Sequence, residues 1–207
     1  MKKIIALILV VVLSLCLCAC GGSKTLEDMV AKYEPYASAK DILKTYGKPD
    51  TKSDDGYPEE MLSRYSEEFL MVSGETYTGI SCNGVQLEMH FTNATLDESK
   101  GIDRLYFLYL QEGEGAFTQA EIDEASAAAE KLVSYLKDCY GEPEVKKFDD
   151  DDGGYVMRYS FYTTAKNGTK LTIMLNDLTK DSILQNDESG NLRYPGIVNI
   201  YCVPDEA

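Results

Sequence analysis

The chain has 207 residues and a net charge of −15, because 35 Asp and Glu residues outnumber 20 Lys and Arg residues. A surface of this charge repels phosphate backbones, so we expect no nucleic-acid partner. Hydrophobic residues make up 44% of the chain and tyrosine occurs 15 times. This composition excludes a disordered tail and favours a packed domain.

A secretory signal opens the chain. Lys2 and Lys3 precede the unbroken apolar run Ile4–Leu13, which is shorter than a membrane-spanning helix requires. Leu17-Cys18-Ala19 comes directly before Cys20. This stretch resembles the lipobox of bacterial lipoproteins, in which a Leu and a small residue precede a lipidated Cys.

The lipobox resemblance implies removal of residues 1–19, diacylglycerol on the sulfur of Cys20, and anchoring of the mature lipoprotein to the extracytoplasmic side of a bacterial cell membrane. Residues 20–36 would then form a lipidated tether with a short amphipathic helix over residues 25–33. An ordinary signal peptide or an uncleaved anchor is the alternative.

Two segments downstream of the signal have similar amino-acid sequences. Tyr46-Gly47-Lys48-Pro49 and Tyr140-Gly141-Glu142-Pro143 each end an apolar-periodic stretch, as expected where a helix stops at glycine and proline prevents its continuation. The longer helix is expected to begin at Thr118, which forms a capping box with Glu121. A shorter one is expected to begin near Ser38.

Hairpin signals follow each of these helices. Asn83-Gly84 and Asn167-Gly168 lie between alternating apolar segments, and a further strand is expected near Tyr106 and near Tyr201. The predicted fold is α+β, with two tandem helix-then-antiparallel-strand repeats whose helices pack on one face of a shared or paired sheet. The repeats would span 37–112 and 113–207.

The two Tyr-Gly-x-Pro segments and their hairpins weakly resemble the duplicated α/β modules of the beta-lactamase-inhibitor-protein and SmpA/OmlA type. The resemblance covers most of residues 37–207 and implies a binding module rather than an enzyme.

Catalytic and metal-binding patterns are scarce in the sequence. His90 is the single histidine, and no zinc-type spacing, Walker loop or dinucleotide glycine pattern occurs, so we expect no metal and no cofactor. The acidic run Asp149–Asp152 lacks the alternating spacing of a calcium loop, so an acidic turn is favoured over a cation site.

The remaining cysteines are Cys82, Cys139 and Cys202, so at most one disulfide can form among them. Cys202 shares a strand face with core residues, and Cys139 lies near the end of the helix expected to cover that face. They are the most plausible pair, with three buried free thiols as the alternative.

A strip of aromatic residues is predicted on the face of the sheet that the helices leave open. Alternation along the strands, with register set by the two Asn-Gly turns, assigns these residues to it: Tyr77, His90, Tyr106, Tyr159, Phe161 and Tyr201. Exposed rings suit recognition of a protein or a polysaccharide. The alternative is that a covering segment makes the strip a second core.

The sequence therefore predicts a non-catalytic, membrane-anchored lipoprotein with a binding or protein-interaction role. The alternatives are a cell-wall or polysaccharide hydrolase that uses paired carboxylates, and an assembly accessory of a membrane complex.

Overall fold

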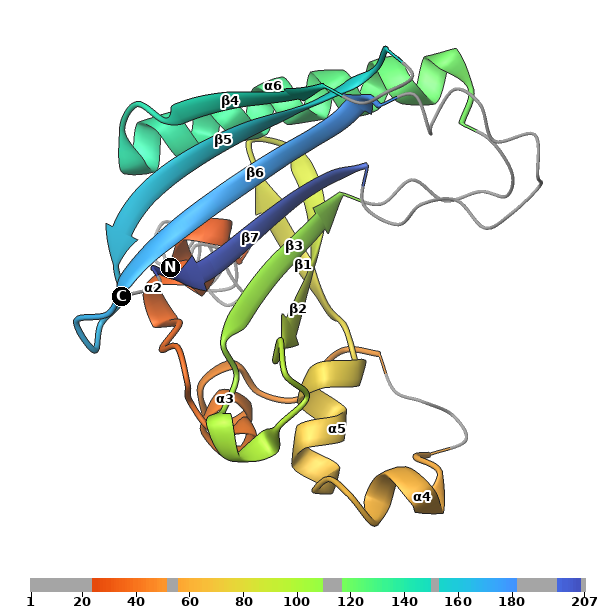
Figure 1. Cartoon of the computed structure of the whole chain (residues 1–207), viewed down its shortest axis with the longest axis vertical. Coiled ribbons are helices and arrows are strands. Elements are labelled where there is room, and N and C mark those ends of the chain that lie inside the picture. Colours follow the sequence, from red (N-terminus) through yellow and green to blue (C-terminus); the bar gives the residue numbers. More distant parts are fainter. Residues whose placement is uncertain (1–23, 52–55, 110–116, 150–152, 182–196, 206–207) are drawn as a thin grey trace, which may run out of the picture.

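The structure is a computed structural model that describes residues 24–51, 56–109, 117–149, 153–181 and 197–205. Within these residues the chain forms five α-helices and one open antiparallel sheet of seven strands, so the α+β class is as predicted (Figure 1).

The first part of the chain holds four short helices and three strands. These are α2 (Leu26–Lys32), α3 (Ala39–Tyr46), α4 (Glu59–Leu62), α5 (Glu67–Gly74), β1 (Tyr77–Cys82), β2 (Val85–Thr92), the 3-10 helix η1 (Glu98–Lys100) and β3 (Arg104–Tyr109). Thr25 and Ser38 cap α2 and α3 by accepting hydrogen bonds from Asp28 N and Asp41 N. Such caps satisfy amide groups that have no partner within the helix.

The second part holds one long helix and four strands. These are α6 (Gln119–Tyr140), β4 (Glu144–Asp149), β5 (Tyr155–Thr164), β6 (Lys170–Lys180) and β7 (Val198–Pro204). The capping box of Thr118 and Glu121 begins α6, as predicted. Gly47 and Gly141 end α3 and α6 with nearly the same backbone angles, φ 82° and ψ −169° against φ 87° and ψ −166°.

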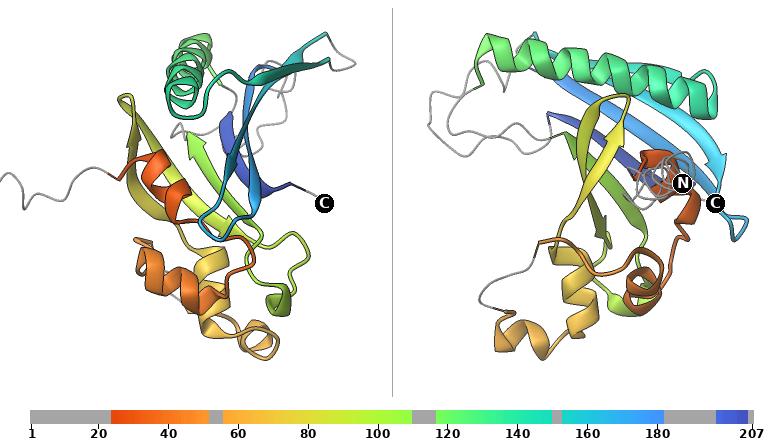
Figure 2. Two further views of the ribbon diagram at one scale, coloured as in Figure 1. Left: turned by 90° about the vertical axis from the view of Figure 1, so that its left-hand side faces the viewer. Right: turned by 180° about the vertical axis from the view of Figure 1, so that it is seen from behind.

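The sheet order is β1-β2-β3-β7-β6-β5-β4, so β3 and β7 join the two parts at its centre. Figure 2 shows α2 and α6 on the same side of the sheet. On that side Met89, Phe107, Ile200 and Leu175 lie directly opposite one another on β2, β3, β7 and β6, and none is more than 1% exposed. The hydrophobic core therefore lies between the helices and one face of the sheet.

The two Asn-Gly pairs lie at hairpin turns but make different connections. Asn83 and Gly84 both have positive φ, 51° and 79°, as a two-residue type I′ turn requires. In the second hairpin the Ala165 amide donates to the Thr169 carbonyl at 2.7 Å, so three residues form the tip. This difference changes the register of β5 and decides which of its side chains reach the open face.

Candidate functional site

One row of side chains crosses the open face of the sheet. The strand pairings place His90 opposite Tyr106, Tyr106 opposite Tyr201, and Tyr201 opposite Met174. The His90 and Tyr106 rings stack with centroids 4.9 Å apart, and the Tyr106 and Tyr201 rings stack at 5.8 Å. All four side chains are partly exposed, and we call them the open-face row. The predicted orientation of His90, Tyr106 and Tyr201 agrees with this arrangement, and their role in binding stays a prediction.

Tyr77 does not reach the open face, so its predicted orientation is wrong. Its ring is 1% exposed and packs edge-on against Phe91, with centroids 5.5 Å apart. The register of β1 shifts between Tyr77 and Ile80, where Gly79 has a φ of 73°, so Tyr77 pairs with Met89 and not with His90. A shift of one residue moves a side chain to the other face of a sheet.

Phe161 and Tyr159 also lie on the helix side, contrary to prediction. Phe161 pairs with Ile173 and is 1% exposed, whereas Tyr159 pairs with Leu175 and packs against the core beneath α6. The prediction assumed a two-residue turn at Asn167-Gly168. The three-residue tip displaces the pairing by one position and reverses the face of both rings.

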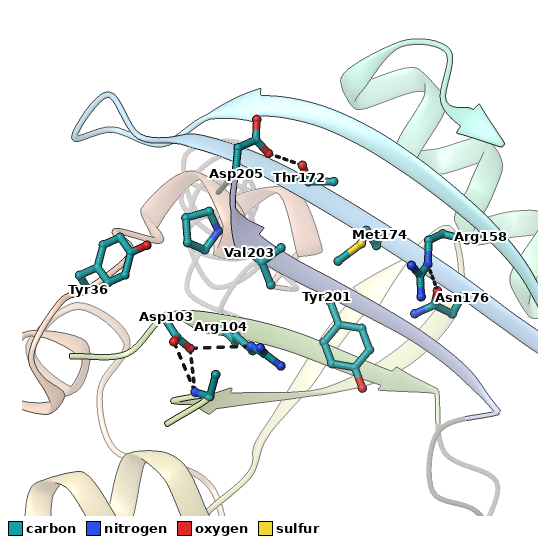
Figure 3. Close-up of a pocket in the computed structure, with 12 residues that line it drawn as sticks. Tyr36, Asp103, Arg104, Arg158, Thr172, Met174, Asn176, Tyr201, Val203 and Asp205 are labelled. Carbon is teal, nitrogen blue, oxygen red and sulfur yellow. Dashed lines mark hydrogen bonds and ion pairs between the residues drawn. The ribbon is translucent and has the colours of Figure 1, made fainter. Parts of the chain in front are cut away.

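A groove with a volume of about 610 Å³ lies beside Tyr201 on the open face (Figure 3). We call it the open-face groove. Its principal lining residues are Tyr36, Asp103, Arg104, Arg158, Met174, Asn176, Tyr201 and Asp205. A volume of this size is typical of sites that bind small molecules or the end of a larger one.

Two contacts position Arg158 in the open-face groove. Its Nε donates to Asn176 Oδ1 at 2.7 Å, and Asn176 Nδ2 in turn donates to Asn199 Oδ1 at 2.8 Å. The guanidinium carbon lies 4.8 Å from the ring centroid of Phe148. Both asparagines are buried, so their amide groups need these partners. The network holds the guanidinium plane and leaves its Nη groups on the groove side.

Arg104 and two carboxylates occupy the rest of the open-face groove. Arg104 Nε lies 3.9 Å from Asp103 Oδ1, and Figure 3 shows Arg104 and Arg158 on either side of Tyr201. Asp103 accepts the Ala94 amide at 3.0 Å, and Asp205 accepts the Thr172 hydroxyl. Both carboxylates therefore hold neighbouring parts of the chain.

The electrostatics at the other end of the open-face row differ. His90 Nε2 is buried without a hydrogen-bond partner among the described residues, and it lies 3.6 Å from Glu88 Oε2. Burial lowers the pKa of His90 and raises the pKa of Glu88, because removal of water disfavours the charged form of each. His90 is therefore neutral at pH 7, and this contact is not an ion pair.

The predicted pairing of Cys139 with Cys202 is wrong, because Cys82, Cys139 and Cys202 are all free thiols. Cys139 Sγ lies 3.7 Å from Glu27 Oε2, at the α2 side of the molecule, whereas Cys202 is fully buried in the core. Burial raises the pKa of Cys82 to about 11, so this thiol is protonated at neutral pH.

No group of three or more metal-ligating side chains occurs within the part of the chain that the structure describes. Of the acidic run, Asp149 pairs with Lys147 at 2.5 Å, and residues 150–152 lie outside the described residues. Cys20 lies outside them as well. No helix of the described residues is long and apolar enough to cross a membrane.

Arg104, Arg158 and Asn176 were not singled out from the sequence. Each is a polar residue beside an apolar or aromatic one in a strand, and this alternation is the signal that could have identified them. Such alternation assigns each side chain to a face of the sheet, but it does not determine which residues of distant strands lie side by side on that face.

Comparisons of the chain with protein-family models, with curated proteins and with solved structures found no match.

Proposed function

We propose that this chain is a non-catalytic lipoprotein, anchored through Cys20 on the extracytoplasmic side of a bacterial cell membrane. It binds a protein or polysaccharide partner through the open-face row and the open-face groove. The observation that carries this proposal is the aromatic stack of His90, Tyr106 and Tyr201, which ends at the edge of the groove. Aromatic rings provide a large contact area and lose little rotational freedom on binding.

A binding role accounts for the groove better than hydrolysis with two carboxylates. A glycoside hydrolase needs an acid and a second carboxylate that both face the scissile bond. In the groove, Asp103 accepts a backbone amide and Asp205 accepts a hydroxyl group of its own sheet. These bonds give both acids a structural role.

Capture of the partner from detergent-solubilised membranes tests the proposal. Tyr106→Ala and Tyr201→Ala should reduce the amount of co-purified partner while leaving the thermal midpoint nearly unchanged. Val145→Ala is the matched control, because Val145 is 48% exposed on the opposite face of the sheet. Equal capture by all three variants would contradict the proposal.

We further propose that residues 37–112 and 113–207 are tandem copies of one module. The similar ends of α3 and α6 support this, and so does the mirrored order of β1-β2-β3 and β5-β6-β7 about the centre of the sheet. The proposed resemblance to the beta-lactamase-inhibitor-protein and SmpA/OmlA modules has the same basis. An experimental structure in which the halves fail to superpose would contradict it.

A further inference from the structure

We propose that the open-face groove recognises a carboxylate group of its ligand, and that the guanidinium of Arg158 binds this carboxylate. The inference rests on the proposed binding function and specifies its chemistry. The carboxylate belongs either to the end of a peptide or to an acidic sugar, since both present the same planar anion.

The positioning of Arg158 is the first support. One edge of its guanidinium is used by Asn176 and one side of its plane faces the Phe148 ring. The two Nη groups make no hydrogen bond with another described residue, and they form the parallel fork that binds a carboxylate with two hydrogen bonds. None of the ion pairs among the described residues includes Arg158.

The second support for the inference is the unfavourable free energy of burying the two amide side chains that hold Arg158. Asn176 and Asn199 are 7% and 6% exposed, in the middle of a sheet whose other face is apolar. Buried amides are unfavourable unless they are hydrogen-bonded, and two apolar residues would fill these positions without that requirement. Orienting the Arg158 guanidinium toward a ligand explains why amide side chains occupy these two buried positions.

The charges of the chain and of the groove favour a ligand with a single negative charge. The chain carries a net charge of −15, whereas this groove contains two of the chain's four arginines, Arg104 and Arg158. A polyanion would meet the repulsion of the surrounding surface, and a doubly charged phosphate would also face Asp103 and Asp205 in the groove. A single carboxylate requires only the Arg158 fork.

Size and shape agree with this ligand class. From Arg158 and Asn176 to Thr172 the groove follows β6 for four residues, about 13 Å at the rise of a strand. This length fits about four extended residues or a short saccharide. Tyr201 and Met174 supply an apolar floor beside the charged end.

Arginine-selective NMR on the full-length chain in detergent micelles tests the inference. The chain has four arginines, so the Arg158 Nε signal can be assigned by its loss in Arg158→Lys. The probes are N-acetyl-trialanine against its C-terminal amide, methyl glucuronide against methyl glucoside, and inorganic phosphate. We expect one of the two acids to shift the Arg158 signal, and its neutral counterpart to leave the signal unchanged.

Matched variants distinguish bidentate binding by Arg158 from a general effect of positive charge in the groove. Arg158→Met and Arg104→Met each remove one positive charge from the groove. Loss of the fork should weaken binding of the responding acid about ten-fold or more, whereas Arg104→Met should have a smaller effect. Arg158→Lys keeps the charge and should still lose most of the affinity. Thermal midpoints identify any variant that is unfolded.

Several outcomes would overturn the inference. It fails if neither acid shifts the Arg158 signal, if the neutral analogues bind as well as the acids, if phosphate binds more tightly, or if the two methionine variants weaken binding equally. Partner capture that depends on Tyr106 and Tyr201 would leave the proposed binding function standing in each of these cases.

Discussion

At the scale of single residues, His90 has an unusual setting, because its ring stacks on Tyr106 while its Nε2 atom is buried beside Glu88. Burial lowers the pKa of His90 below its ordinary value of 6.5. His90 therefore binds a proton less readily in the folded protein than in the unfolded chain.

This difference predicts how stability depends on pH. Between the lowered pKa of folded His90 and the ordinary value of 6.5, the unfolded state binds more protons, so stability falls as the pH decreases. We expect His90→Phe, which keeps a ring on Tyr106, to lose less thermal stability than the wild type between pH 7 and pH values below 6.5. Thermal midpoints measured across this range provide the test.

Glu88→Gln is the control for this experiment, because burial raises the pKa of Glu88. A carboxyl with a raised pKa favours the folded state at low pH, which is opposite in sign to the effect of His90. The wild type is compared with His90→Phe, and the comparison is repeated with Glu88→Gln present in both chains. If the thermal midpoints of the two chains change with pH in parallel in both comparisons, His90 does not titrate as described.

At the scale of elements, the register of β1 depends on Gly79. Its φ of 73° places it in the region that side chains with a Cβ rarely adopt, and a Cβ there would meet no heavy atom within 4 Å. The conformation of the backbone, and not the available space, is therefore the reason for glycine.

We expect Gly79→Ala to lower the free energy of unfolding by about 1–2 kcal/mol, because alanine must adopt a left-handed conformation. Denaturant unfolding measures the change. The matched control is Gly74→Ala at the end of α5, where φ is not positive and the nearest heavy atom, in the Tyr57 ring, lies 3.9 Å from the added Cβ. The control should be neutral or stabilising, and equal losses in both variants would exclude backbone strain as the cause.

At the scale of the whole molecule, the described domain begins close to the proposed anchor. Lys24 already forms a bridge with Ile80 of β1, so few residues separate Cys20 from the sheet. A lipid on Cys20 would hold the domain near the membrane surface.

We expect Cys20→Ala to move the chain from the detergent phase to the aqueous or unprocessed fraction, because the substitution removes the proposed lipid attachment site. Phase partition and mass spectrometry measure this. Cys18→Ala is the control, since residue 18 would leave with the signal peptide. An unmodified Cys20 on a secreted chain would refute the proposed anchor.

The sequence by itself determined the features that depend on neighbours along the chain. The caps at Ser38 and Thr118, the helix ends at Gly47 and Gly141, and the turn at Asn83-Gly84 all follow from local backbone preferences. Strand alternation also accounts for the burial of Leu105 and Ile200 on the face opposite Tyr106 and Tyr201, because it has a fixed period of two residues.

Only the tertiary structure decided which residues meet on the open face. A glycine bulge in β1 and an additional residue in the β5–β6 turn each displace the register by one position, and this reversed the predicted faces of Tyr77 and Phe161. The pairing of β3 with β7 brought Tyr106 beside Tyr201, and the neighbouring strands brought Arg158 to Asn176 and Asn199. The physical reason is that contacts between distant strands depend on the summed register of every intervening pair, which local propensities do not determine.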